Sequence, residues 1–98
     1  IINDFQKHIV KIYSEDNYSA KKIAGKLGYV EDAYMLGEEL HLVVDDYDAI
    51  KQRLMEDYKI HGIKIQLINK IDPSLEDVFV NIIKSRQFTD APMGEINE

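Results

Sequence analysis

The chain contains no cysteine among its 98 residues, and its longest aliphatic run is only Leu42-Val43-Val44. Without cysteine there is no disulfide scaffold, no thiolate metal site and no thiol nucleophile. A membrane-spanning helix needs about 20 consecutive apolar residues, and no signal-peptide pattern is visible either. These absences fit a soluble domain in a reducing compartment, with no direct membrane insertion.

Positive charge is also scarce. Lys and Arg number 12 against 18 Asp and Glu, which gives a net charge of −6 and a pI near 5.0. A chain with this charge is a poor direct partner for nucleic acid or for an anionic membrane surface. The remaining composition, 45% hydrophobic and 31% charged, is ordinary for a globular domain. A chain of this length can bury one core without disulfides or metal.

Hydrophobic periodicity divides the chain into strands and helices. Alternation of apolar and polar residues is typical of half-buried strands, and a repeat of three to four residues is typical of helices that pack on a core. The strands are expected at 7–13, 29–35, 39–45 and 63–68, and the helices at about 20–27, 47–58 and 74–85.

Capping and turn residues support these boundaries. Ser19 and Asp46 are placed to accept hydrogen bonds from the first amides of the first two helices. Gly28 and Gly62 fit the ends of the same helices, and Gly37 fits a hairpin turn between two strands. The capping and turn residues and the hydrophobic periodicity therefore predict the same helices and strands.

The order βαββαβ plus a final helix predicts an α+β fold, a ferredoxin-like antiparallel sandwich with an additional C-terminal helix. Right-handed crossovers give the strand order four-one-three-two, with two helices on one face. The open face, expected to carry Ile9, Val43 and Ile68, or else a partner domain, would cover the apolar stripe of the third helix. We expect a linker at 1–6, the α+β domain at 7–86 and a flexible tail at 87–98.

The start of the third helix has a local physical logic. Pro73 suits the first turn of a helix, and either Asp72 or Ser74 can cap its amides. Ser74 and Asp77 have capping-box spacing, with Asp in place of the better Glu. Phe79 is expected to anchor the helix in the domain's core. The apolar stripe consists of Leu75, Val78, Phe79, Ile82 and Ile83.

The same stretch, Pro-Ser-Leu-Glu-Asp-Val-Phe-Val from Pro73 to Val80, closely resembles a sequence near the end of many ABC-transporter ATP-binding subunits of the ABC-2 (drug- and antibiotic-export) type. In that family it closes a small C-terminal domain that follows the ATPase domain. The resemblance extends weakly over about 9–84, and the chain begins at Ile1 rather than Met, which together suggest a piece of a longer protein. The family motif residues are Pro73, Ser74, Leu75, Glu76, Asp77, Val78 and Phe79.

The resemblance implies a non-catalytic accessory domain with a role in interaction or regulation. The parent chain would bind Mg-ATP and hydrolyse it, whereas this segment has no Walker A, Walker B, Ser-Gly-Gly signature or switch His and would hold no cofactor. The implied partners are the ATPase domain of the same chain, a second ATP-binding subunit and a membrane permease subunit, with a homodimer also open. The implied location is the cytoplasmic side of the cell membrane, through the transporter complex.

Other candidate chemistry is weak. Gly25-Lys26 lies inside a helix pattern and lacks the rest of a phosphate loop. The acidic residues at 46 and 48 fit an N-cap better than a calcium loop. His8, His41 and His61 share no ligand spacing, so we expect neither a metal site nor catalytic residues.

Two other functions use the same fold. RNA binding is disfavoured by the net charge and by the lack of an aromatic residue in the strand at 39–45. The alternative that stays open is a free-standing ACT-type regulatory module that binds a small ligand between two protomers. Such modules usually carry Gly in the loop after the first strand, and residues 16–19 contain none.

Overall fold

The computed structural model describes the backbone of residues 7–94 and the side chains of residues 7–84. The expected linker at 1–6 and the last four residues of the expected tail lie outside the described residues. The chain forms two compact units, which are described separately below. One comprises residues 6–72, and the other contains the segment from Pro73 onward.

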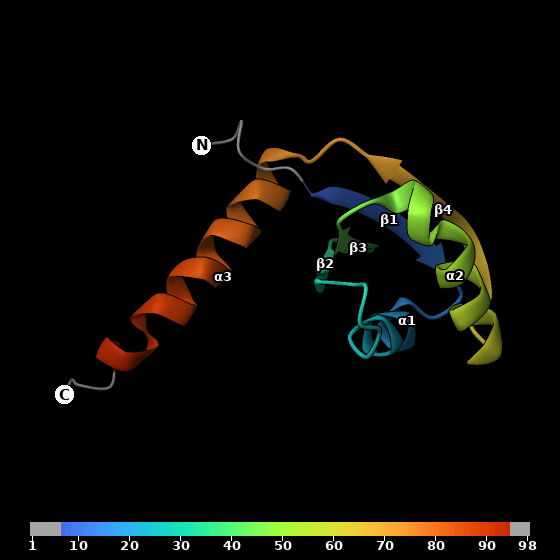
Figure 1. The fold of residues 1–98 in the computed structure, drawn as a ribbon, viewed down its shortest axis with the longest axis horizontal. Helices are drawn as coiled ribbons and strands as arrows, with labels where there is room; N and C mark the ends of the chain where they lie inside the picture. The colour runs from blue at the N-terminus through green and yellow to red at the C-terminus, as the bar shows by residue number, and fades with distance from the viewer. Residues whose placement is uncertain (1–6, 95–98) are drawn as a thin grey trace. The chain divides into compact units, whose positions relative to one another are not determined.

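The first unit is a four-stranded antiparallel sheet with two helices (Figure 1). The strand order is β2-β3-β1-β4, with β3 and β4 both paired to β1, so the predicted ferredoxin-like topology is confirmed. The elements are β1 (His8–Ser14), α1 (Asn17–Ala24), β2 (Asp32–Leu36), β3 (Glu39–Val44), α2 (Tyr47–Ile60) and β4 (Ile65–Ile71), followed in the second unit by α3 (Leu75–Gly94).

The main core lies between the helices and one face of the sheet. In β1 and β3, residues that face the helices alternate with residues on the other face of the sheet. The helices therefore cover the same side of both central strands. At the centre the Tyr58 hydroxyl donates to the Ala20 carbonyl at 2.8 Å, which ties α2 to α1. The most deeply buried members are Val10, Ile12, Ala20, Ala24, Leu40, Leu42, Val44, Leu54 and Tyr58.

Caps and turns follow the sequence except at the two ends of α1, whose C-cap is Gly25 rather than the predicted Gly28. Asp46 accepts from the amides of the first turn of α2, and Gly37 and Gly62 have φ values of 64° and 76°, which a side chain would strain. The cap of α1 is Asp16 rather than the predicted Ser19, whose amide donates to Asp16 at 3.1 Å. Asp16 is the preferred cap because its carboxylate accepts hydrogen bonds from both the amide and the hydroxyl of Ser19.

The expected face of Ile68 is wrong, and a β-bulge is the reason. Between β1 and β4 the pairing passes from Tyr13–Leu67 to Ser14–Ile65, which leaves Gln66 without an opposite residue. A bulge of this kind reverses the alternation of the strand beyond it. Ile68 therefore pairs with Ile12 and packs against the main core. Its expected companions Ile9 and Val43 do lie on the opposite face.

The second unit contains α3, which begins at the residue after Ser74 as expected but continues to Gly94. The helix was expected to end near Ser85, because Pro92 and Gly94 suggested an irregular tail. Pro92 has no backbone N–H and so removes one hydrogen bond of the helix, but it lies only two residues before the end of α3, and glycine is a common helix terminator. The part of the expected tail at 87–94 is helical.

Candidate interaction site at the start of α3

The start of α3 is held by a reciprocal pair of hydrogen bonds. Ser74 Oγ accepts from the backbone N–H of Asp77 at 3.1 Å, and Asp77 Oδ2 accepts from the backbone N–H of Ser74 at 2.9 Å. The Ser74 hydroxyl also donates to Asp77 Oδ2 at 2.9 Å. The predicted capping box is therefore present, with Ser74 rather than Asp72 as the cap and Pro73 just before it. It fixes the direction in which the first turn presents its side chains.

The motif residues separate into a buried side and an exposed side. Asp77 is fully buried and Val78 nearly so. Leu75 and Phe79, in contrast, are 75% and 61% exposed, and Ile82 is 41% exposed. These three lie at positions i, i+4 and i+7, so they form one continuous apolar strip, here called the α3 strip. Large apolar side chains that are exposed as a contiguous strip are typical of an interaction surface.

Phe79 was expected to anchor α3 in the domain's core, and in the structure it leaves 61% of its surface exposed. An apolar stripe that is wider than one packing surface must be covered from two sides. Among the described residues of α3, the stripe is buried on one side, at Val78. Pro73 and Glu76, the remaining motif residues, are exposed, and Ser74 is half-buried. Sequence periodicity finds the strip but does not say which half of it the domain itself covers.

A polar cluster lies on the sheet face opposite α1 and α2. Glu39 accepts from the Tyr13 hydroxyl at 3.0 Å and is bonded to His41 Nε2 at 2.9 Å. These hydrogen bonds from His41 and Tyr13 lower the pKa of Glu39, because they stabilise its charged form. The rings of His41 and Tyr34 are 5.9 Å apart. Spacing in the sequence did not suggest this cluster, since its members come from three different strands.

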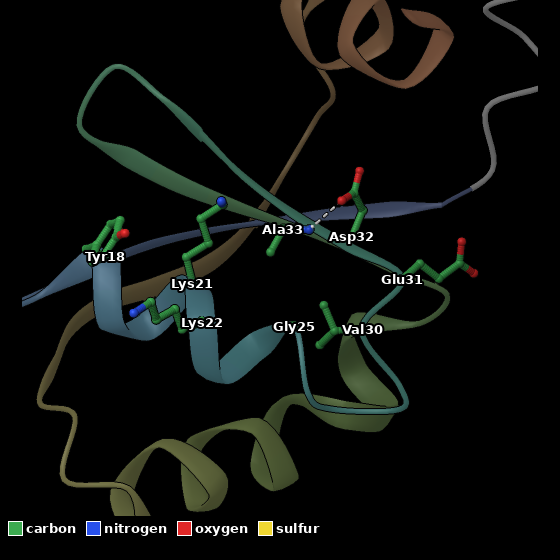
Figure 2. A pocket seen from close by; sticks show the side chains of 8 residues that line it. All are labelled: Tyr18, Lys21, Lys22, Gly25, Val30, Glu31, Asp32 and Ala33. Atoms are coloured by element: carbon green, nitrogen blue, oxygen red, sulfur yellow. Dashed lines mark hydrogen bonds between the residues drawn. The ribbon is translucent and has the colours of Figure 1, made fainter. Parts of the chain in front are cut away.

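A hollow of about 370 Å³ lies between α1 and β2 (Figure 2). Lys21 and Lys22 border it from α1, with the Lys22 ammonium 5.1 Å from the centre of the Tyr18 ring. Glu31 and Asp32 border it from the other side, and Figure 2 shows the bond from the Ala33 amide to the Asp32 carboxylate, at 2.9 Å. The hollow therefore carries charges of both signs.

This hollow is poorly suited to a nucleotide phosphate. Its helical wall runs along the side of α1 from Tyr18 to Gly25 and includes the last turn, where the backbone carbonyls favour cations rather than anions. The carboxylates opposite would repel a phosphate, and Glu31 is occupied by the Lys7 ammonium at 2.6 Å. Gly25, from the Gly-Lys pair considered above, simply caps α1. A phosphate cradle needs amides at the start of a helix, which this arrangement does not offer.

His8 and His61 make hydrogen bonds near the two ends of α2. His8 Nδ1 accepts from the Tyr47 amide at 2.9 Å, at the start of α2, and the His61 ring is bonded to the Asp57 carbonyl at 2.8 Å. Across residues 7–84, no group of three or more histidine or acidic side chains could hold a metal ion. Within the same part of the chain, no helix is long and apolar enough to cross a membrane.

One comparison with known proteins gives a match. The sequence model of a family described as "ATP-binding protein DrrA1-3-like, C-terminal domain" matches residues 1–83. No curated protein and no solved structure shows significant similarity to the chain. The matched range includes the whole sheet, both of its helices and the capped start of α3 with Phe79.

Proposed function

The chain belongs to this family of C-terminal domains of ATP-binding proteins, and on that premise we propose that it is a non-catalytic interaction domain of the ATP-binding subunit of an ABC exporter. The parent chain would bind and hydrolyse Mg-ATP upstream of Ile1 and drive export through a separate permease subunit. The whole would work at the inner face of the cell membrane. The family match favours this role over a free-standing ACT-type module.

The α3 strip is the observation that carries the proposal. In a domain that needs no partner, an amphipathic helix buries its apolar side. Here Leu75 and Phe79 stay largely exposed beside the capping box. Fully burying side chains of this size contributes about 1.5–3 kcal/mol each, which is enough to hold a partner surface. The ATPase domain of the same chain, a second ATP-binding subunit and the permease subunit are the partners we propose for it. A homodimer through the same strip is a further arrangement of this kind.

The experiment uses the full-length parent protein with its permease. Phe79→Ser should reduce co-purification of the subunits by about tenfold or more, because it places a hydroxyl where an apolar contact forms. Ile60→Ser is the matched control, since Ile60 is 76% exposed but lies at the end of α2. Mg-ATP affinity of the isolated subunit should not change in either variant.

Two outcomes would contradict the proposal. Subunit assembly and transport that tolerate Phe79→Ser as well as Ile60→Ser would show that the α3 strip binds nothing essential. Saturable micromolar binding of Mg-ATP to the 98-residue chain alone would point instead to a nucleotide-sensing module.

A further inference from the structure

A second surface, in the sheet unit, has a chemistry of its own. A groove of about 400 Å³ runs between α2 and the start of β4, here called the α2–β4 groove. Its apolar lining comes from Met55 on the helix and from Ile63 and Ile65 opposite. Met55 is 40% exposed, so an unbranched, adaptable side chain is presented to solvent where the groove opens.

The rim of this groove is basic. Lys51, Lys59 and Lys64 border it, against one carboxylate, Glu56. This excess of positive charge stands out in a chain whose net charge is −6. None of the three lysines forms an ion pair with any carboxylate of the described residues. Lys51 lies 5.9 Å from the centre of the Tyr47 ring, which leaves its ammonium available to a further partner.

Both walls of the groove are fixed before anything binds. Lys51, Met55 and Lys59 are spaced by four residues along α2, so they form one line about 12 Å long. The opposite wall is held by two backbone hydrogen bonds, from the Ile63 amide to the Tyr58 carbonyl at 2.9 Å and from the Glu15 amide to the Lys64 carbonyl at 3.2 Å. A preformed groove loses little conformational entropy when it is filled.

We propose that the α2–β4 groove binds an acidic amphipathic helix supplied by another protein. Two turns of a helix span the 12 Å line, so apolar side chains at i and i+4 would reach Met55 and Ile65. Carboxylates on either side of that stripe would meet Lys51 and Lys59 at the two ends and Lys64 across the groove. The apolar floor supplies affinity, while the basic rim selects against basic and neutral helices.

The charge pattern also disfavours the two other occupants. An anionic membrane, unlike a single helix that contacts only the groove, is broad enough to face the acidic remainder of a chain of net charge −6, which would repel it. A second copy of the chain would bring another six negative charges, and the two copies would repel each other at long range. The inference goes beyond the proposed function, because the groove belongs to the sheet unit and shares no residue with the α3 strip.

The test measures binding of a designed peptide to the full 98-residue chain by fluorescence anisotropy. The probe is a labelled helical peptide of about 15 residues, long enough to be partly helical, with Leu at i, i+4 and i+7 and Glu on both flanks. A second peptide carries Lys at every Glu position. The acidic peptide should bind at least about tenfold more tightly than the basic one, and added salt should weaken it.

Variants of the chain locate the binding. The double substitution Lys59→Glu with Lys64→Glu should weaken binding of the acidic peptide by about tenfold or more. Met55→Glu should have the same effect, because it places a negative charge in the apolar lining of the groove. Lys70→Glu is the control: it makes the same charge change as each of the two lysine substitutions, on β4 but outside the groove, and it should alter affinity by less than about twofold. Far-UV circular dichroism confirms that each variant is folded.

Several results would overturn the proposal. Equal affinity for the acidic and basic peptides would show that the rim does not select charge. An equal loss in Lys70→Glu would show that only net charge matters. Self-association of the chain, or binding to phosphatidylglycerol vesicles, that the Lys59/Lys64 substitution abolishes would assign the groove to a second copy or to a membrane instead.

Discussion

The sharpest single test of the structure is the truncation of Phe79. Periodicity in the sequence places Phe79 in the core, where removal of a buried Phe costs about 3–5 kcal/mol. The structure leaves 61% of its surface exposed, so only about two fifths is covered. Full burial of Phe contributes about 1.5–3 kcal/mol, and the covered share therefore about 0.6–1.2 kcal/mol. Alanine also favours a helix over Phe by about 0.5 kcal/mol, which offsets part of that loss.

We therefore expect Phe79→Ala to lower the free energy of unfolding by less than about 1 kcal/mol. Because about 1 kcal/mol shifts the melting temperature of a domain of this size by about 4–8 °C, the expected shift is only a few degrees. The comparison is Leu54→Ala, at a fully buried position of α2 in the main core. That truncation should cost about 2–5 kcal/mol and lower the melting temperature by at least about 8 °C.

Thermal unfolding followed by circular dichroism, with urea titrations for the free energies, gives both values. If Phe79→Ala destabilised the 98-residue chain as much as Leu54→Ala does, Phe79 would belong to the folded core. The argument for the α3 strip as an interaction surface would then fail. A small effect in the isolated chain together with a large loss of subunit assembly is the pattern that the exposed strip predicts.

Three further predictions concern local structure. Ser74→Ala removes the two bonds of the Ser74 hydroxyl, from the Asp77 amide and to Asp77 Oδ2, and leaves the bond from the backbone N–H of residue 74; it should reduce stability by about 1 kcal/mol, with a loss of helical signal in far-UV circular dichroism, and an unchanged spectrum would contradict the cap. Gly62→Ala, at φ 76°, should lower stability by about 1–2 kcal/mol, whereas Gly28→Ala, which meets no atom within 4 Å, should not; equal urea midpoints for the two would refute the strain at Gly62. The pKa of Glu39 is held below its usual 4.5 by the histidine and tyrosine beside it, so its stabilising contribution is present above that pH and is lost as the pH falls through the lowered value. Glu39→Gln should therefore lose less stability than the unmodified chain when urea titrations are repeated from neutral to acid pH, and parallel losses would exclude this role.

The order of elements was predictable because each one has a local signal. Alternation in β3 and the Asp46 cap of α2 act over a few residues, and the two positive-φ glycines sit where the chain must turn. Local signals also predicted the capping box at Ser74 and Asp77 correctly. The sequence therefore predicts best those features that depend only on residues close together in the chain.

The sequence predicted less well those features that depend on residues far apart in the chain. The side of the sheet that Ile68 faces depends on the bulge opposite Ser14, which no pattern within β4 reveals. The exposure of Phe79 depends on how much of an apolar stripe the domain covers, and periodicity cannot divide one stripe between a core and a partner. The basic α2–β4 groove was missed for the same reason, since Lys51 and Lys64 are brought together only by packing.

The bulge in β4 also makes this edge strand resistant to misalignment. A strand with uniform alternation can shift by two residues along its neighbour and still present its apolar side chains to the same face. In β4 the residues before and after Gln66 have opposite phase, so Ile65 and Ile68 both face the core in the observed pairing. A shift of two residues would either move the bulge away from Ser14 or, with the bulge kept opposite Ser14, turn one of these isoleucines outward. The irregularity therefore excludes slipped pairings that a regular strand would permit, and insertions or deletions near Gln66 should be tolerated far less well than at the turn around Gly37.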